Sequence, residues 1–214
     1  MQYLFNTFNS FVSYSKSIGI GLRVWAKQKQ EDCYVGGGAP TLTNFPVGCV
    51  IQAGTPAKID ETTRVVTIHT SFEVYETAAQ SATSIKVKKN INNSVAHASM
   101  YVMVAPATVT GTGTGIQVTA VNTSNKLYDV FTVAALAAEI PAGTILVEAD
   151  KSGASAVTLV VPNGLITDDI YKGEFTTQYS CNVAFAGAVY ARRIPPVSAA
   201  IQASLNKIQF LNNK

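Results

Sequence analysis

The side chains that could do chemistry are few in this chain, and their spacing brings no catalytic group together. The two histidines, His69 and His97, stand in a β-branched run and in an Ala/Ser context, without a carboxylate or cysteine at metal-ligand spacing. We expect each to be a surface histidine or a hydrogen-bonded histidine of a sheet. Asp168 and Asp169 follow a Pro-Asn-Gly turn signal and point to opposite faces if extended, so they make a poor acid/base pair.

The thiols and the glycine-rich loop also favour structural roles. Cys33, Cys49 and Cys181 are odd in number and widely spaced, which is typical of neither a disulfide framework nor a zinc site. We expect three small buried residues in a reducing compartment. Residues 111–115, GTGTG, lack the Lys and Ser/Thr of a phosphate-binding loop and precede a strand-like run, which indicates a β-turn. The sequence therefore predicts no enzyme, no metal and no cofactor.

The segments that must position these residues are mostly extended. Short runs rich in β-branched residues, with partial alternation and separated by Gly, Pro, Asn and Asp, occupy 63–69, 84–88, 116–121, 157–161 and 183–191. They predict a mainly β protein whose body, residues 41–190, is a sandwich or a barrel. The Ala-rich residues 132–139, just before Pro141, suggest one short helix inside this body.

The first 35 residues differ in character from the body and are interpreted as an arm. Large apolar residues recur there at spacings of four and three, the pattern of a helical seam; they are Leu4, Phe8, Phe11, Ile18, Leu22 and Trp25. Gly19 and Gly21 weaken a helix, so an extended arm is the other form. The arm is expected either to anchor or oligomerise the protein or to pack on its own domain. Gly36, Gly37 and Gly38, followed by Ala-Pro, predict a hinge between arm and body.

Two further patterns concern the end of the chain and an internal echo. Pro196 and the spacing of Val197, Ile201, Leu205 and Ile208 predict a C-terminal helix within residues 192–214. The segment IQAGT at 51–55 is echoed by IPAGT at 140–144. If the echo is not coincidence, it marks two equivalent β-turns rather than a solenoid, because a solenoid needs more copies.

Composition limits the class of protein. The chain has 214 residues, of which 47% are hydrophobic and 14% charged, with a net charge of +3. About 25% charged residues is usual, so this composition excludes a disordered chain. It indicates either that much of the surface faces another protein or that the surface is a β surface rich in Thr and Ser. The basic residues are scattered, which argues against nucleic-acid binding. No apolar run reaches the roughly 18 residues of a membrane-spanning helix, and no signal peptide is evident.

Six segments, taken in order, resemble phage head fibre proteins, also called capsid decoration proteins, of crAss-like and other Bacteroidota phages. They are VIQAGTPAKIDETTR (50–64), ATSIKVKK (82–89), VNTSNKLYD (121–129), IPAGTILV (140–147), PNGL (162–165) and ARRIPP (191–196). The resemblance spans about 45–200. It implies a virion structural protein on the outside of the capsid, often oligomeric and without catalytic residues.

The resemblance and the composition together lead us to expect a structural virion protein. We expect a dimer or trimer that contacts the major capsid protein or other virion proteins, assembles in the host cytoplasm and resides on the capsid surface. The alternative is a phage adhesin that binds a host glycan, with Trp25, Tyr171 and Tyr179 as stacking groups. A capsule-degrading hydrolase would need two carboxylates about 5–10 Å apart, and the acidic residues show no spacing that points to it.

Overall fold

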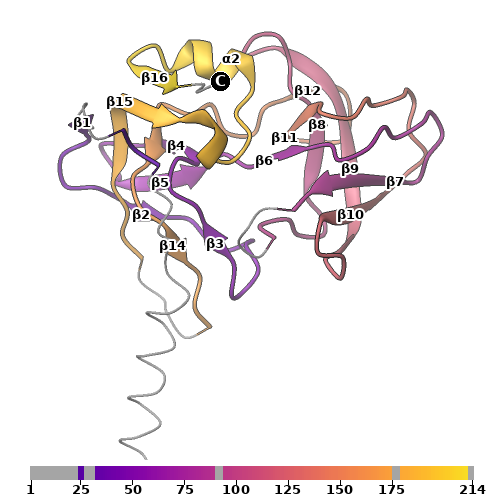
Figure 1. The fold of residues 1–214 in the computed structure, drawn as a ribbon, viewed down its shortest axis with the longest axis horizontal. Helices are drawn as coiled ribbons and strands as arrows, with labels where there is room; N and C mark the ends of the chain where they lie inside the picture. The colour runs from indigo at the N-terminus through magenta and orange to yellow at the C-terminus, as the bar shows by residue number, and fades with distance from the viewer. Residues whose placement is uncertain (1–23, 27–31, 90–93, 175–178, 212–214) are drawn as a thin grey trace, which may run out of the picture.

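The protein folds into two β-lobes, one inserted into the other (Figure 1). The computed structural model describes residues 24–26, 32–89, 94–174 and 179–211. We call residues 71–157 the inserted lobe, and the described parts of 24–68 and 163–211 the terminal lobe. Residues 69–70 and 158–162 link the two. The expected mainly β body is confirmed, and its sheets curve into closed, barrel-like layers.

The terminal lobe is built on a sheet that closes on itself. Its path runs through β1 (Asp32–Cys33), β15 (Val183–Tyr190), β13 (Gly164–Ile166), β4 (Pro56–Ile59), β5 (Val65–Ile68) and β2 (Ala39–Pro40). The two edges of the sheet meet because its edge strands, β1 and β2, both belong to the continuous segment 32–40. Gly38, just before β2, exchanges two backbone hydrogen bonds of 2.9 Å with Cys181, just before β15. A two-stranded pair, β3 (Val50–Ile51) with β14 (Ile170–Tyr171), lies beside this sheet.

Both faces of this sheet are covered at β13, so this central strand is buried throughout. On β13, Leu165 and Ile166 are adjacent and therefore point to opposite faces, and both are fully buried. Ile166 belongs to the core enclosed by the sheet, with Leu42, Ile51 and Val66 among its members. Leu165 belongs to the outer core. That outer core is closed by α2 (Ala199–Ser204) and by β16 (Ile208–Leu211), which pairs in parallel with β15.

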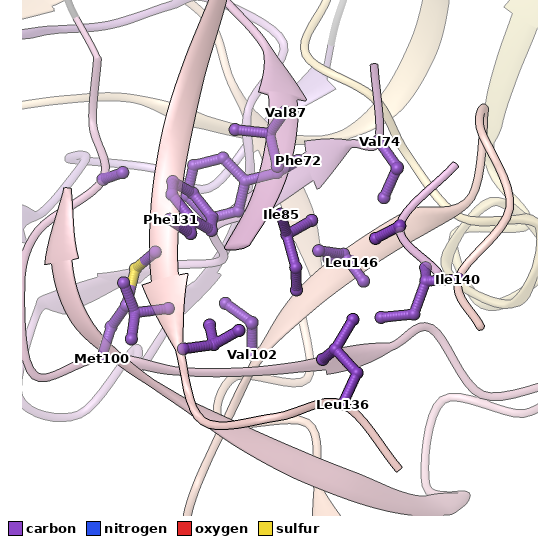
Figure 2. Packing of buried hydrophobic residues seen from close by; sticks show 14 residues of the cluster. Phe72, Val74, Ile85, Val87, Met100, Val102, Phe131, Leu136, Ile140 and Leu146 are labelled. Carbon is purple, nitrogen blue, oxygen red and sulfur yellow. The ribbon is translucent and has the colours of Figure 1, made fainter. Parts of the chain in front are cut away.

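The inserted lobe is a second closed sheet with its own core. Its path runs through β6 (Ser71–Glu73), β11 (Ile145–Ala149), β8 (Tyr101–Val104), β9 (Thr112–Asn122), β10 (Tyr128–Val133) and β7 (Ser84–Lys88). Val74, just after β6, bridges Val87 of β7 and completes the ring. Figure 2 shows the apolar side chains that fill it; Phe72 and Phe131 meet there edge to face, with ring centroids 5.0 Å apart. A further strand, β12 (Gly153–Val157), pairs with the first part of β9.

The C-terminal zone departs from the expected helix over 192–214. It contains a 3₁₀ turn η1 (Ala191–Arg193), the short helix α2 and then β16. The apolar positions Val197, Ile201, Leu205 and Ile208 are all buried, as their spacing indicated. Ser198 begins α2 by accepting a hydrogen bond from the backbone of Ile201. The chain becomes extended after Leu205 because β15 offers an edge, and pairing with it satisfies backbone groups that a longer helix would bond internally.

The short helix expected at 132–139 is also absent from the structure. β10 extends to Val133, and the residues after it donate backbone hydrogen bonds across the lobe rather than within a turn of helix. Leu136 donates to Ala82 and Ile140 donates to Ala78. Leu136 and Ile140 are buried in the lobe core, so tertiary contacts override the helix propensity of the Ala-rich run.

The internal echo corresponds to two turns of the same form. Gly54 has φ +83° and Gly143 has φ +80°, and each is the third residue of its turn. Thr55 donates to the carbonyl of Gln52 (3.1 Å), and Thr144 donates to that of Pro141 (3.3 Å). This is the geometry of a type II turn. Each turn leads into a strand, β4 in one lobe and β11 in the other, which confirms the interpretation as equivalent β-turns.

Candidate functional site

The predicted assembly residues begin before the described body, and one of them lies inside it. Leu4, Phe8, Phe11, Ile18 and Leu22 are outside the described residues, so their role stays a prediction. Trp25 is only 8% exposed and packs in the outer core of the terminal lobe. Its indole Nε1 donates to the Thr167 carbonyl at 3.2 Å, and its backbone bridges Val189 of β15. Trp25 is thus a residue of the terminal lobe's own core, as expected if this part of the chain packs on its own domain. This corrects its assignment to the assembly interface and to a glycan-stacking site.

The expected hinge at Gly36, Gly37 and Gly38 is a corner of the closed sheet. A Cβ on Gly37 would lie 2.7 Å from the Cys181 carbonyl oxygen, and one on Gly38 would lie 2.6 Å from a methyl of Val66. Real Cβ atoms do not approach so closely, so glycine is required there by packing. The same segment pairs with β15 before the corner and with β5 after it. The body therefore includes Val24–Ala26, β1 and the glycines, and the arm–body boundary near residue 35 is corrected.

The two links between the lobes are held side by side by His69 and β11. The Nδ1 of His69 lies 2.8 Å from the carbonyl oxygen of Val160 on the other link. On β11, the backbone of Glu148 donates to Thr70 of the first link and accepts from Leu159 of the second. The junction is thus a continuation of sheet pairing, and His69, 1% exposed, lies at its centre.

A cavity of about 220 Å³ lies at this junction. Its apolar wall comes from both lobes and from the C-terminal segment; it includes Phe45, Val50, Phe72, Val95 and Pro195. Its polar lining includes His69, two ion pairs, and Gln52, Thr55, Thr70, Ser71 and Ser94. Of these, Gln52, Thr55 and Ser71 donate to backbone carbonyls, and Thr70 donates to Glu148. Lys89 Nζ lies 3.1 Å from Asp129 Oδ1, and Lys88 Nζ lies 2.5 Å from Glu73 Oε1.

Two buried polar atoms of cavity residues lack a hydrogen-bond partner among the described residues. They are Nε2 of His69 and Oδ1 of Asp129, whose ion pair with Lys89 does not reach hydrogen-bond geometry. Burial lowers the pKa of His69 to about 4, so its imidazole is neutral at neutral pH. Since a carbonyl only accepts, Nδ1 carries the proton, and Nε2 is left as an acceptor.

A second, more open hollow lies on the far side of the glycine corner. It measures about 510 Å³ and is lined by Gly36–Gly38, Arg64, Asp168 and the segment 179–182. Its lining thus combines a guanidinium, a carboxylate, an aromatic ring (Tyr179) and an amide (Asn182). Tyr171, the other expected stacking group, does not line it. We call this hollow the polar groove.

The remaining chemistry-bearing residues lie apart. Among the described residues, no cluster of three or more His, Cys, Asp or Glu side chains could hold a metal ion. The Asp168 carboxylate accepts from Thr167, whereas that of Asp169 accepts from the Ala53 backbone, so the acidic pair is divided. Cys49 and Cys181 are buried, and burial raises the pKa of each thiol to about 11. Such thiols are poor nucleophiles at neutral pH.

Sequence reasoning missed the groups that define the junction. His69 was expected to be a surface histidine or a hydrogen-bonded histidine of a sheet. It is buried, and only one of its ring nitrogens is hydrogen-bonded to the residues that the structure describes. Lys89 and Asp129 are 40 positions apart, and nothing in their local context links them. Lys89 directly follows β7 and Asp129 lies in β10, and these two strands pair. Both residues belong to the resembling segments, so pairing of those segments was the available indication of their contact.

Comparison with protein-family models, curated proteins and solved structures gives no match for this chain. In the part of the chain that the structure describes, no helix is long and apolar enough to span a membrane.

Proposed function

We propose that this chain is a non-catalytic structural protein of a phage virion, a head fibre or capsid decoration protein on the outside of the capsid. Its apolar N-terminal series, Leu4 to Leu22, docks on copies of the chain or on the capsid shell. The observation that carries the proposal is that the residues that follow this series, Val24–Ala26, are hydrogen-bonded to β15. Ala26 donates to Ala188, Tyr190 donates to Val24, and Trp25 is buried beside them.

The hydrogen bonds between Val24–Ala26 and β15 are suited to a chain that is anchored through its N-terminal residues. Force on residues 1–23 would pass directly into β15, a central strand of the terminal lobe that pairs with β1, β13 and β16. The low charge of the chain, 14%, supports a protein whose surface is largely interface. The resemblance of six ordered segments to head fibre proteins supports the virion location.

The test is the native mass of the full chain and of a variant lacking residues 1–23, measured by light scattering. The truncation stops before Val24 so that Trp25 and its bonds to β15 remain. We expect a defined dimer or trimer that becomes a monomer on truncation. The double substitution Phe8→Asp with Phe11→Asp should do the same, whereas the matched change Ser10→Asp with Ser13→Asp should not.

Location is tested separately from assembly. Phage particles purified on a density gradient should contain peptides of this chain, and an antibody against the body should label intact particles. Absence of the chain from such particles would overturn the virion role. A monomer in every variant would instead assign the N-terminal series to the capsid shell, which cosedimentation of the two lengths with capsids then checks.

A second candidate function is glycan recognition, and the polar groove is the observation that favours it. Pyranose rings are bound by aromatic faces together with amide and charged groups that fix the hydroxyls. Tyr179, Asn182, Asp168 and Arg64 bring these groups to one hollow. Binding of the full chain to a glycan array, lost in Asn182→Ala but kept in Gln117→Ala on the inserted lobe, would support this function. Absence of binding to every glycan on the array would exclude this function.

A further inference from the structure

A hollow of about 450 Å³ lies beside the edge strand β2 of the terminal lobe. We call it the apolar hollow; the apolar residues that line it are Ala39, Pro40, Leu42, Val47, Val65 and Tyr179. Val47 is 60% exposed and Val65 is 40% exposed. Single exposed apolar residues are common on protein surfaces, but apolar residues that gather at one hollow indicate an interaction surface.

The loop that carries Val47 is held in place by Lys172. The Nζ of Lys172 donates to main-chain carbonyls of this loop, those of Leu42, Thr43 and Phe45. Gly48, next to Val47, donates its backbone N–H to the Lys172 carbonyl at 2.8 Å. This wall of the hollow is therefore formed before a partner binds, which reduces the entropy that binding costs.

The edge of β2 excludes one kind of partner, an added β-strand. Pro40 has no N–H group. The N–H groups on either side of it are used, because Ala39 donates to Arg64 and Thr41 donates to Val66. Residues 39–41 therefore offer no main-chain donor to a further strand. A partner must dock through its side chains, as an amphipathic helix does with apolar residues at spacings of three and four.

The N-terminal series of this chain, Leu4 to Leu22, has such spacings, and its large apolar side chains need cover from water. Its charge also matches the hollow. Lys16 and Arg23 are the charged side chains of residues 1–23, so this segment is basic. Glu174, which lines the hollow, and Asp168, which lines the adjoining polar groove, are both exposed carboxylates.

The point where the series joins the body favours the hollow of a second copy over that of the same chain. Tyr190, at the end of β15, donates to Val24, so residues 1–23 join the body at that end. The glycine corner before β2 is bonded to Cys181, beyond the other end of β15. Residues 181–190 span up to about 30 Å at roughly 3.3 Å per residue. The series reaches a neighbour's hollow without turning back along its own body.

We propose that the apolar hollow is the docking site for the N-terminal series of a second copy of this chain. The inference rests on the proposed docking of this series and names the surface that receives it. Each copy then carries one donor, the series, and one acceptor, the hollow. Such contacts close into a reciprocal dimer or into a ring of three.

The experiment measures the native mass of full-length variants over a range of concentrations by light scattering. Val65→Asp places a charge in the hollow and should raise the dissociation constant of the oligomer at least tenfold, as should Val47→Asp. Val104→Asp is the matched control, because Val104 of β8 is 45% exposed and lies in the inserted lobe; it should assemble as the unchanged chain does. Circular dichroism checks that each variant is folded. Unchanged assembly of both hollow variants would overturn the proposal and leave the series docked at another surface.

A mixture of two variants tests the pairing of donor and acceptor. The double variant Phe8→Asp with Phe11→Asp keeps the hollow and loses the series, whereas Val65→Asp keeps the series and loses the hollow. Each alone should be monomeric, and an equimolar mixture should contain a complex of one copy of each. A mixture that stays monomeric would overturn the proposal. A monomeric unchanged chain would overturn it as well, whereas the virion role is decided separately by the presence of the chain in purified particles.

Discussion

Lys172 organises the loop before β3 through main-chain carbonyls rather than through a carboxylate. Its Nζ donates to Leu42 (2.7 Å), Thr43 (3.3 Å) and Phe45. Hydrogen bonds from a charged donor are worth roughly 1.5–3 kcal/mol, and removing the donor takes this bond from the part-buried Phe45 carbonyl. We expect Lys172→Met to lower the free energy of unfolding by about 2 kcal/mol in urea titrations. Lys151→Met, at an exposed position, is the control and should change it by less than about 0.5 kcal/mol.

His69 makes stability depend on pH. Its pKa is lowered from 6.5 to about 4 by burial, so between these values the unfolded chain binds a proton that the folded chain does not. The contribution is therefore complete above about pH 6.5 and is lost as the pH falls toward 4. Between pH 7.5 and 5 we expect a loss of about 2 kcal/mol in the free energy of unfolding.

Urea unfolding at the two pH values checks this expectation. His97→Gln, which changes the more exposed histidine, should retain the difference between pH 7.5 and 5. His69→Gln should lower stability at pH 7.5 and remove most of the pH-dependent part. A difference of the same size in the His69 variant would assign the acid sensitivity to the carboxylates instead.

At the scale of elements, the two echoed turns provide a matched comparison. Alanine at Gly143 has open space around its Cβ, so its cost is the left-handed backbone alone, roughly 1–2 kcal/mol. Alanine at Gly54 has the same backbone cost, and its Cβ would also lie 2.1 Å from a methyl of Ile194. Overpacking typically adds 1–3 kcal/mol. We therefore expect Gly54→Ala to lower the free energy of unfolding by at least 1 kcal/mol more than Gly143→Ala. Equal decreases in the free energy of unfolding would show that Ile194, which follows η1, can shift to accommodate the added methyl group at little cost.

These elements show what the sequence could and could not predict. Alternation and turn residues located the strands at 65–68, 84–88 and 183–190, and the burial of Ile201 and Ile208 followed from their spacing. The extended form of 208–211 could not follow, because it depends on the edge of β15. The sequence suggested a hinge at glycines 36–38. The residues that leave no room for a side chain there, Cys181 and Val66, are distant in sequence. The cavity is likewise made by residues of both lobes, and local patterns carry no information on how lobes meet.

At the scale of the molecule, the insertion of one closed sheet into another leaves two links between the lobes, and hydrogen bonds hold these links together. Most inter-domain connections are exposed and polar, whereas here both links pair with Glu148 and enclose a buried histidine. The two lobes are therefore expected to move as one body.

The N-terminal boundary gives the clearest prediction for the whole molecule. A chain lacking residues 1–23 keeps Val24–Ala26 and β1, and we expect cooperative thermal unfolding within a few degrees of the full chain. A chain lacking residues 1–35 loses Trp25 from the outer core and β1 from the edge of β15. Removing a buried Trp alone costs about 3–5 kcal/mol, a large part of the 5–15 kcal/mol that stabilises a typical domain. We expect the second truncation to melt at least 10 °C lower or to be insoluble. Equal melting temperatures would mean that the terminal lobe closes without this segment, and that the body begins at the glycines after all.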